Sequence, residues 1–519
     1  MAANTWQRLA GATALARAIV RPERADRLPR AVLAAAPWGA TLPGVVAAAS
    51  ARYPTASAVV DDDGTLTYAE LWSTTDALAS ALREREIGPG SAVGILCRNH
   101  RVFVQAMVAA AKVGADLVFL NTGFAGPQLA DVAASEALAA VLHDDDLADV
   151  ARAAEPRPTL SSDEIAELAA RRSFTPVPPT HRSGRVVILT SGTTGRPKGA
   201  ARSTTGGLDG LLPLLVIPMR ARDTVVVAPP LFHAWGLAHL GFALARSSTV
   251  VLRRRFDPAD TVAAVARHRA AGLVVVPVML QRILALGDEL SAFDVSNLRY
   301  LATSGSALGA TTARAALERF GPVVYNLYGS TEVSVATIAT PADLQADAAT
   351  VGRPPPGSVV RVVDERGADV PAGVVGRIFV GNAGRFEGYT GGGGKEDLGG
   401  LISIGDVGHF DAAGRLFVDG RDDEMIVSGG ENVYPAEVED LLHGHPAVEQ
   451  AAVVGVPDAE FGQRLRAYVV RRPGARVRAE TLQAYVRERL ARYKVPREIR
   501  FVDELPRTTS GKLRKQDLS

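Results

Sequence analysis

The chain has a single cysteine, Cys97, among its 519 residues, so it cannot form an intramolecular disulfide. A lone cysteine fits a reducing compartment, and we expect a cytoplasmic protein. No apolar run reaches the roughly 18 residues of a transmembrane helix, and the N-terminal arginines are scattered rather than placed before an apolar core as in a signal peptide. The formal net charge is +1, which gives no whole-chain reason to expect nucleic acid as a partner.

Lysine is also scarce. Of the 57 basic side chains only six are lysines, at positions 112, 198, 395, 494, 512 and 515. Arginine therefore carries nearly all of the general surface charge. Lysine is a compact point charge, whereas arginine is a planar fork, so a narrow site for one phosphate or carboxylate oxygen can require lysine. Each retained lysine is thus a candidate for a specific role.

A chain of this length with 47% hydrophobic residues is too long for one core, which predicts two or three domains. From Thr41 onward, short β-branched or leucine-rich runs alternate with helical stretches, a pattern typical of parallel sheets covered by helices. Asp257 and Pro258 predict a helix start, and Gly272 is expected to close that helix. The predicted strands are Ala58–Val60, Ala92–Leu96, Asp116–Leu120, Ala140–Leu142, Val186–Leu189, Thr224–Val227, Thr249–Leu252 and Leu273–Val276.

Three segments differ in composition from the alternating pattern that begins at Thr41: residues 1–40, the stretch after Pro354–Gly357 and residues 385–400. Residues 1–40 carry six arginines against two acidic residues, so an amphipathic helix could touch the inner face of a membrane or pack on the enzyme body, and its alanine-rich apolar face favours packing. After Pro354–Gly357, short β-like runs between Gly and Asp turns predict a β-rich subdomain. Residues 385–400 hold seven glycines and are expected to be mobile.

The most informative segment is Leu189–Ala200, which reads LTSGTTGRPKGA and directly follows the apolar run Val186–Leu189. A loop rich in Gly, Ser and Thr at the end of a buried strand presents backbone N–H groups and hydroxyls to a polyphosphate, and Lys198 adds a charge. The glycine spacing differs from that of a Walker A loop. A flexible linker is the alternative, but a linker requires neither the apolar strand nor the Pro-Lys-Gly ending.

This segment resembles the phosphate-binding signature of the adenylate-forming superfamily, which includes acyl-CoA synthetases, adenylation domains of peptide synthetases and beetle luciferases. Further matches follow in the order that this family has: Tyr328–Glu332, Gly405–Asp406, Gly420–Asp423, Ser428–Asn432 and Pro506–Lys512. The resemblance implies an α/β fold with a large N-terminal domain of parallel sheets over residues 41–420, a hinge at 421–423 and a small α+β lid domain over 424–519.

The resemblance also implies a reaction. A carboxylate attacks the α-phosphate of ATP to give an acyl adenylate and pyrophosphate, and the acyl group then passes to a thiol. The implied cofactors are ATP, Mg²⁺ and CoA, and the expected substrate is a carboxylic acid, favoured to be a fatty acid. An anion must approach a polyanion, so charge neutralisation and alignment are the main catalytic needs. The alternatives are an acyl-AMP ligase that loads a carrier-protein phosphopantetheine, a luciferase-like oxidase and a non-catalytic nucleotide-binding regulator.

The phosphate and metal contacts follow from the same resemblance. Lys198 and the loop, with Thr194 among the catalytic residues, would hold the β- and γ-phosphates. Glu332 would bind Mg²⁺ as a hard oxygen ligand, and Thr331 would contact the α-phosphate. From the residues alone, Ser330–Glu332 would equally suit a helix N-terminus. The other implied nucleotide contacts are Thr190, Ser191, Gly192, Thr193, Gly195, Asn326, Tyr328 and Gly329.

The nucleoside contacts match less fully. Asp406 resembles the aspartate that accepts hydrogen bonds from the ribose hydroxyls, with Arg421 as its companion, although an isolated Gly-Asp is otherwise an ordinary turn. The usual threonine two positions before Asp406 is replaced by Ile404, which puts the local geometry in question. The residues that stand where the family lines its adenine pocket are Gly305, Ser306 and Ala307.

His233 matches an aromatic-flanked histidine that lies beside the acyl carboxylate in this family. A lone histidine among apolar residues is more often structural, but its place on a loop after a predicted strand favours function. Trp235 could gate a fatty-acyl tunnel or pack in the core.

The C-terminal domain supplies the remaining implied residues. Lys512 matches the lysine that serves adenylation, brought in by a closing lid, although its place near the chain end would also suit a frayed tail. Asp423 resembles the hinge residue. Gly429 and Gly430 would line the pantetheine tunnel, where any side chain would obstruct a thiol.

Overall fold

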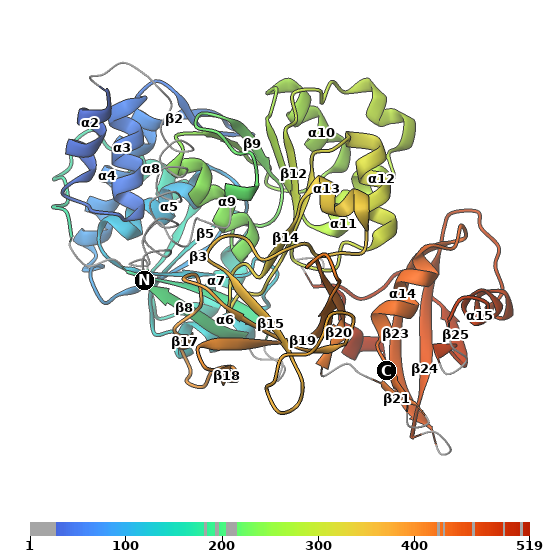
Figure 1. Ribbon diagram of the computed structural model, residues 1–519. Helices are drawn as coiled ribbons and strands as arrows, with labels where there is room; N and C mark the ends of the chain where they lie inside the picture. Colours follow the sequence, from blue (N-terminus) through green and yellow to red (C-terminus); the bar gives the residue numbers. More distant parts are fainter. Residues whose placement is uncertain are drawn as a thin grey trace, which may run out of the picture.

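The computed structural model describes residues 27–180, 184–191, 197–203, 215–422, 426–428, 431–458, 462–490, 494–508 and 512–518. Within these ranges the chain forms four β-sheets with covering helices, which confirms the predicted α/β class. The C-terminal unit, coloured orange to red, lies to one side of the larger N-terminal part (Figure 1). No helix in the described ranges combines the length and apolar character needed to span a membrane.

The first sheet has eight strands in the order β14-β13-β12-β11-β9-β10-β1-β2. Its inner pairs are parallel, and β2 and β14 join the edges in antiparallel orientation. The strands are β1 (Ser57–Asp61), β2 (Gly64–Thr67), β9 (Thr224–Val227), β10 (Thr249–Val251), β11 (Gly272–Val275), β12 (Tyr300–Thr303), β13 (Val324–Tyr328) and β14 (Thr337–Ala339). The helices that pack on it in a separate core are α10 (Pro258–Arg267), α11 (Pro277–Leu284), α12 (Ala310–Phe320) and α13 (Pro341–Ala346).

The second sheet has seven strands in the order β17-β8-β7-β4-β3-β5-β6, again parallel in its centre. Its strands are β3 (Ala92–Leu96), β4 (Asp116–Phe119), β5 (Leu138–His143), β6 (Thr159–Ser161), β7 (Arg185–Ser191), β8 (Pro197–Ser203) and β17 (Gly388–Tyr389). The other N-terminal helices are α2 (Arg27–Ala35), α3 (Leu42–Arg52), α4 (Tyr68–Glu84), α5 (Arg101–Lys112), α6 (Gly126–Ser135), α7 (Ala148–Ala151), α8 (Ser162–Ala169) and α9 (Ala234–Ala245).

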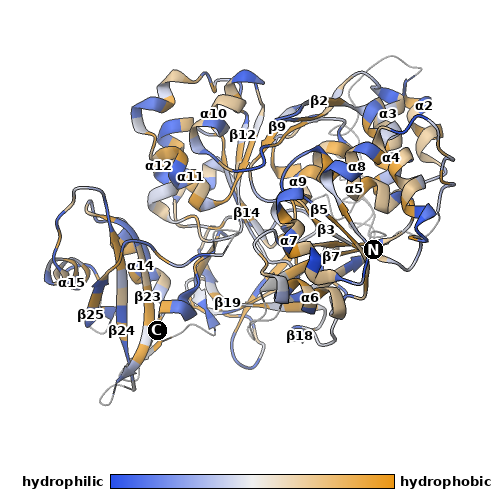
Figure 2. Cartoon of the chain, turned by 180° about the vertical axis from the view of Figure 1, so that it is seen from behind, coloured by the Kyte–Doolittle hydropathy of each residue, from blue (hydrophilic) through white to orange (hydrophobic). Residues whose placement is uncertain are grey.

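The largest apolar core joins these two sheets through α3, α4, α5 and α9. Helix α5 is buried along nearly its whole length, because it lies between the sheets rather than on the surface. Apolar residues are concentrated on the central strands, whereas the outer helices show mixed colours (Figure 2). The shared core fixes the sheets against each other, so their loops can form one site.

Two smaller sheets complete the molecule. The β-rich subdomain is antiparallel and consists of β15 (Val359–Val363), β16 (Gly376–Gly381), β18 (Asp397–Leu398), β19 (Leu401–Phe410) and β20 (Leu416–Arg421). The C-terminal sheet comprises β21 (Ile426–Ser428), β22 (Glu431–Val433), β23 (Val448–Asp458), β24 (Gly462–Arg471) and β25 (Glu498–Phe501), with its own apolar core. The helices of this unit are α14 (Pro435–His443) and α15 (Ala479–Arg487).

Most local predictions are confirmed, and one is wrong. All eight predicted strands form, and the Asp257 side chain caps α10 by accepting from the Asp260 amide at 2.8 Å. Gly272, however, does not close α10. It begins β11, where an added Cβ would lie 2.1 Å from the Tyr300 ring, so glycine is required there for strand packing.

The glycine-rich segment 385–400, which the sequence predicts to be mobile, contains two short strands. It contributes β17, which pairs with β8, and the short strand β18. Five of its seven glycines have positive φ values, so they serve tight turns that other residues would strain. Composition alone does not distinguish glycines that loosen a segment from glycines that allow it to turn sharply.

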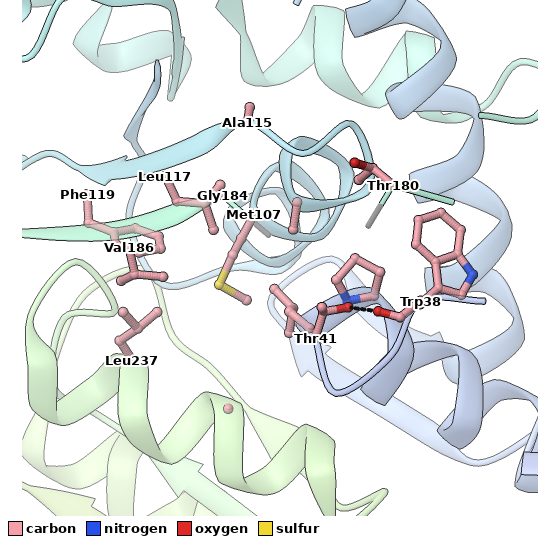
Figure 3. A pocket seen from close by; sticks show the side chains of 14 residues that line it. Trp38, Thr41, Met107, Ala115, Leu117, Phe119, Thr180, Gly184, Val186 and Leu237 are labelled. Atoms are coloured by element: carbon pink, nitrogen blue, oxygen red, sulfur yellow. Dashed lines mark hydrogen bonds between the residues drawn. The ribbon is translucent and has the colours of Figure 1, made fainter. Parts of the chain in front are cut away.

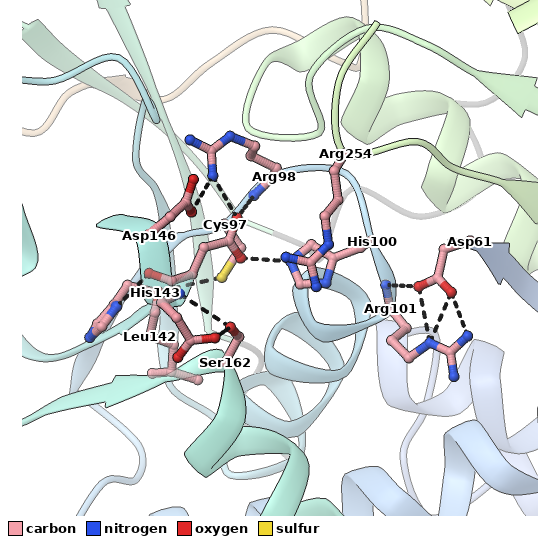
Figure 4. Close-up of polar contacts among 12 residues, drawn as sticks. Asp61, Cys97, Arg98, His100, Arg101, Leu142, His143, Asp146, Ser162 and Arg254 are labelled. Carbon is pink, nitrogen blue, oxygen red and sulfur yellow. Dashed lines mark hydrogen bonds and ion pairs between the residues drawn. The ribbon is translucent and has the colours of Figure 1, made fainter. Parts of the chain in front are cut away.

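The loop after β3 connects the two large sheets through polar contacts (Figure 4). His100 Nε2 lies 2.6 Å from an Asp144 carboxylate oxygen, and the Arg101 amide donates to Asp61 at 2.8 Å. Asn99, directly before them in the chain, donates to the Pro229 carbonyl at 2.8 Å and accepts from the Leu231 amide at 2.8 Å. This double hydrogen bond fixes the loop that leads to α9.

Lys112, one of the six lysines of the chain, has a structural role. Its fully buried ammonium contacts Asp76 at 2.6 Å, donates to the Trp72 carbonyl and lies 3.4 Å from the centre of the Trp72 ring. Burial lowers the pKa of Lys112 to about 8, against the opposing effect of Asp76. The pair therefore links α4 to α5 inside the core.

Candidate active site

Several predicted site residues lie at the carboxyl ends of parallel strands from both large sheets, whereas Asp406 and Arg421 lie in β19 and β20 of the β-rich subdomain. β7 leads into the phosphate loop, β9 into the His233 loop, β12 into Gly305 and β13 into Glu332. Open α/β sheets bind ligands at this edge. The shared core brings the edges of the two sheets together.

The phosphate loop connects two antiparallel strands. Thr190 and Ser191 end β7, and their pairing partners are Lys198 and Pro197 in β8. Lys198 is exposed, and its ammonium lies 5.7 Å from the centre of the Tyr389 ring. Four residues predicted to contact phosphate lie outside the described ranges: Gly192, Thr193, Thr194 and Gly195.

Glu332 lies in a tight turn after β13. No helix starts there, so the alternative reading as a helix N-terminus is wrong. A Cβ at Gly329 would lie 2.0 Å from the Ser334 carbonyl oxygen, so the turn requires glycine at that position. The turn brings Glu332 to Tyr389, whose hydroxyl donates to the carboxylate at 2.7 Å.

The environment of Glu332 suits a metal ligand. Burial would raise the pKa of this carboxyl, but hydrogen bonds from Tyr389 and Ser330, together with the charge of Lys395, hold it below its usual value. The group therefore remains an ionised, oriented oxygen donor near neutral pH. Such a donor fits Mg²⁺, which prefers carboxylate oxygens and phosphate co-ligands.

Asp406 is placed beside the same turn. It accepts from the Tyr328 hydroxyl at 2.5 Å, and an Arg421 nitrogen lies 3.6 Å from its other oxygen. Ile404 is buried in the apolar core of the β-rich subdomain. The hydroxyl of Ser403 instead accepts from the Gly405 amide at 3.3 Å. Asp406 is thus held by Tyr328 and Arg421 although the usual threonine is replaced by Ile404.

The predicted adenine-pocket residues border this region. Gly305, Ser306 and Ala307 are exposed after β12, and Gly305 has a φ of 101°, which favours glycine. Asn326 lies within β13 and is buried.

His233 is the N-cap residue of α9, and its Nε2 atom is buried with no hydrogen-bond partner among the described residues. Burial, and then the positive charge of Lys512, lower the pKa of His233 to about 4, so the ring is neutral near pH 7. Trp235 donates from its indole nitrogen to the Val275 carbonyl at 2.9 Å and contacts His239 edge to face. The unpaired nitrogen of His233 is thus available to a ligand.

Lys512 reaches this site from the C-terminal unit. Its backbone exchanges hydrogen bonds with Thr508 in a short turn. The side chain is exposed to solvent, but the surrounding protein lowers the pKa of Lys512, and the negative charges of Glu332 and Asp406 oppose this effect. A residue near the chain end therefore lies within electrostatic range of Glu332, Asp406 and His233.

Three residues at this site were not predicted from the sequence: Asn99, Tyr389 and Arg202. Asn99 holds the loop before α9, Tyr389 orients Glu332, and Arg202 donates to the Thr331 carbonyl. The only sequence signal for Tyr389 is an aromatic residue inside a glycine-rich run. Of the predicted lid residues, Asp423, Gly429 and Gly430 lie outside the described ranges.

An apolar cavity of about 170 Å³ lies between α9 and the second sheet (Figure 3). A helix turns by about 100° per residue, so the Leu237 and Gly241 side of α9 points away from Trp235. At Gly241 no atom lies within 4 Å of an added Cβ. Other lining residues are Trp38, Met107, Phe119 and Val186.

Comparison with known proteins agrees with this geometry. The sequence pattern of the AMP-binding enzyme family matches residues 46–390, and that of the AMP-binding enzyme C-terminal domain matches residues 437–512. The chain belongs to the AMP-binding enzyme family. The predicted resemblance to adenylate-forming enzymes is thereby confirmed. The protein is an AMP-forming acid–thiol ligase with ATP, Mg²⁺ and CoA as cofactors.

Three relatives illustrate the match. The chain is 35% identical over 485 residues to an indoleacetate–CoA ligase of Aromatoleum aromaticum, covering 87% of this chain and 92% of the relative. It is 35% identical to a feruloyl-CoA synthase of an Amycolatopsis species, covering 90% and 96%. The structure of o-succinylbenzoate CoA synthetase from Bacillus subtilis with its acyl-adenylate intermediate superposes with a TM-score of 0.82 at 27% identity, covering 91% and 97%.

The first prediction concerns Lys512. Lys512→Ala should lower adenylate formation about a hundredfold or more, because it removes a cation from beside the developing charge. Thioester formation from supplied acyl adenylate should continue, and the two half-reactions can be followed separately as pyrophosphate release and acyl-CoA formation.

Lys515→Ala is the matched control, because Lys515 lies three residues away and contacts Glu439 of its own domain at 3.0 Å. It should leave both half-reactions close to those of the unmodified enzyme. Equal loss of both half-reactions in Lys512→Ala would contradict a role restricted to adenylation.

Proposed function

We propose that this enzyme activates an aromatic carboxylic acid as its acyl adenylate and transfers the acyl group to CoA. The observation that carries the proposal is the placement of Lys512 within electrostatic range of Glu332, Asp406 and His233. One cation from the C-terminal unit thereby reaches carboxylates and a neutral imidazole of the large domain. This arrangement suits a reaction in which a carboxylate approaches a triphosphate.

The roles of the residues follow from their surroundings. Lys512 neutralises charge as the substrate carboxylate approaches the α-phosphate. His233, being neutral and unpaired at Nε2, orients the carboxylate without adding charge. Asp406 holds the ribose hydroxyls, with Tyr328 and Arg421 fixing its position.

Glu332, oriented by Tyr389, would hold Mg²⁺, which neutralises phosphate charge when bound. Lys198 is exposed at the end of the phosphate hairpin, where it can contact the departing pyrophosphate. After adenylation the C-terminal domain would move about Asp423, so that CoA enters along Gly429 and Gly430. Each residue thus serves charge neutralisation or alignment.

The acyl group is argued from the relatives and from α9. The names of the three relatives specify aromatic acids, which favours an aromatic substrate over the fatty acid expected from the sequence. Trp235 and His239 pack edge to face within α9, two and six residues after His233.

The direct test is a panel of acids with ATP and CoA, followed by chromatography of the nucleotide and thioester products. We expect AMP and an acyl-CoA from aromatic acids such as phenylacetic, indoleacetic and ferulic acid, at a higher kcat/KM than from octanoic or palmitic acid. A preference for the fatty acids would contradict the aromatic assignment. Acyl adenylate that accumulates with saturating CoA and disappears only when a carrier protein is added would contradict the CoA assignment.

A second variant tests whether the cavity receives the far end of long substrates. Gly241 lies about 12 Å along α9 from His233, and its added side chain would enter open space. Gly241→Leu should therefore lower kcat/KM at least about tenfold for acids with an extended para-substituent or a long chain. The kcat/KM for phenylacetic acid should be unchanged.

Gly241→Ala is the control, because it removes the glycine while filling little of the cavity. An unchanged profile in Gly241→Leu across all chain lengths would show that substrates do not enter this cavity.

A further inference from the structure

Strand β8 carries a second cation beyond Lys198. Side chains alternate along a strand, so Lys198, Ala200 and Arg202 share one face of β8. Ala200 packs in the same apolar core as Val333, from the turn that carries Glu332, whereas Ala201 packs in a different core on the other face. The face of β8 that carries Lys198 and Arg202 is therefore directed at the turn that carries Glu332.

The Arg202 guanidinium contacts this turn directly. Its Nη2 atom donates to the Thr331 carbonyl, and the charge of Glu332 stabilises its cationic form. Its Nε atom is buried without a partner, and among the described residues Nη1 makes no hydrogen bond and no carboxylate lies within 4.0 Å of the guanidinium. Within the part of the chain that the structure describes, the group thus has one of its possible hydrogen bonds and no paired carboxylate.

This environment of the Arg202 guanidinium destabilises the folded protein when no anion is bound. Burying a guanidinium without a paired carboxylate carries a desolvation penalty, and an apolar side chain could fill the same space next to Ala200. The fork of an arginine can hold a backbone carbonyl with one nitrogen and an anionic oxygen with another. The missing partner is therefore expected to be a ligand anion.

We propose that Arg202 is a phosphate-binding residue that contacts the β- or γ-phosphate of ATP while it holds the Thr331 carbonyl. This inference rests on the proposed function, because it assumes that ATP binds beside Glu332. It adds a cation on the same strand as Lys198, so the two basic side chains of β8 bind the part of ATP that leaves as pyrophosphate. The nucleoside half of ATP lies with Asp406 and makes no use of Arg202.

The test compares the binding of ATP and of AMP to the full-length protein by calorimetry, with no acid present so that no chemistry occurs. Arg202→Met should weaken ATP binding about tenfold or more, both with Mg²⁺ and with EDTA, because it removes one charge-assisted hydrogen bond. AMP lacks the β- and γ-phosphates, so its affinity should stay within about twofold. Arg202→Lys should keep the charge and lose only part of the ATP affinity.

Arg246→Met is the matched control. Arg246 also has a buried Nε without a partner among the described residues, and its Nη1 donates to the Phe242 carbonyl, but it lies near Tyr300 and Asp223 rather than Glu332. Its substitution should leave the affinities for ATP and AMP equal to those of the unmodified protein.

Two results would overturn the proposal. Unchanged ATP affinity in Arg202→Met would show that the guanidinium does not contact phosphate. An equal loss of ATP and AMP affinity would assign Arg202 to the structure of the turn alone. If the unmodified enzyme bound neither nucleotide, the proposed function itself would fail, which is a separate outcome.

Discussion

Charge repulsion between a carboxylate and a triphosphate is the constraint on which this molecule depends. The two anions react only if cations are held between and around them, and a cation in a narrow, partly desolvated site has a strong effect. Lys512, supplied by a separate C-terminal domain, lies within range of Glu332 and Asp406. A cation on a mobile domain can serve one half-reaction and then leave space for the thiol of the next.

The rest of the fold holds the partners of that cation in place. Two parallel sheets share one core, so the carboxyl ends of their strands meet at a single site. Asn99 fixes the loop before α9, and Tyr389 fixes Glu332. Gly329 allows the turn that brings the carboxylate forward. These contacts lower the cost of ordering the site before substrate binds.

Much of this organisation could be predicted from the sequence, because local signals carried it. Apolar runs gave the strands, Asp257 and Pro258 gave a helix start, and the motifs around Lys198, Glu332, Asp406 and Lys512 gave the family. The contacts that were missed connect distant positions: Tyr389 is 57 residues from Glu332, and Arg202 is 129 residues from Thr331. Such pairings depend on how strands assemble, as does the need for glycine at Gly272, and no local pattern encodes them.

The most direct measurement of the central claim follows the oxygen of the substrate. If the carboxylate attacks the α-phosphate, an acid labelled with ¹⁸O in its carboxyl group must transfer one labelled oxygen to AMP during complete turnover with ATP and CoA. Mass spectrometry of the nucleotide should then show AMP heavier by one ¹⁸O, with unlabelled pyrophosphate. Label in inorganic phosphate, together with ADP as the nucleotide product, would place the attack on the γ-phosphate and contradict the account.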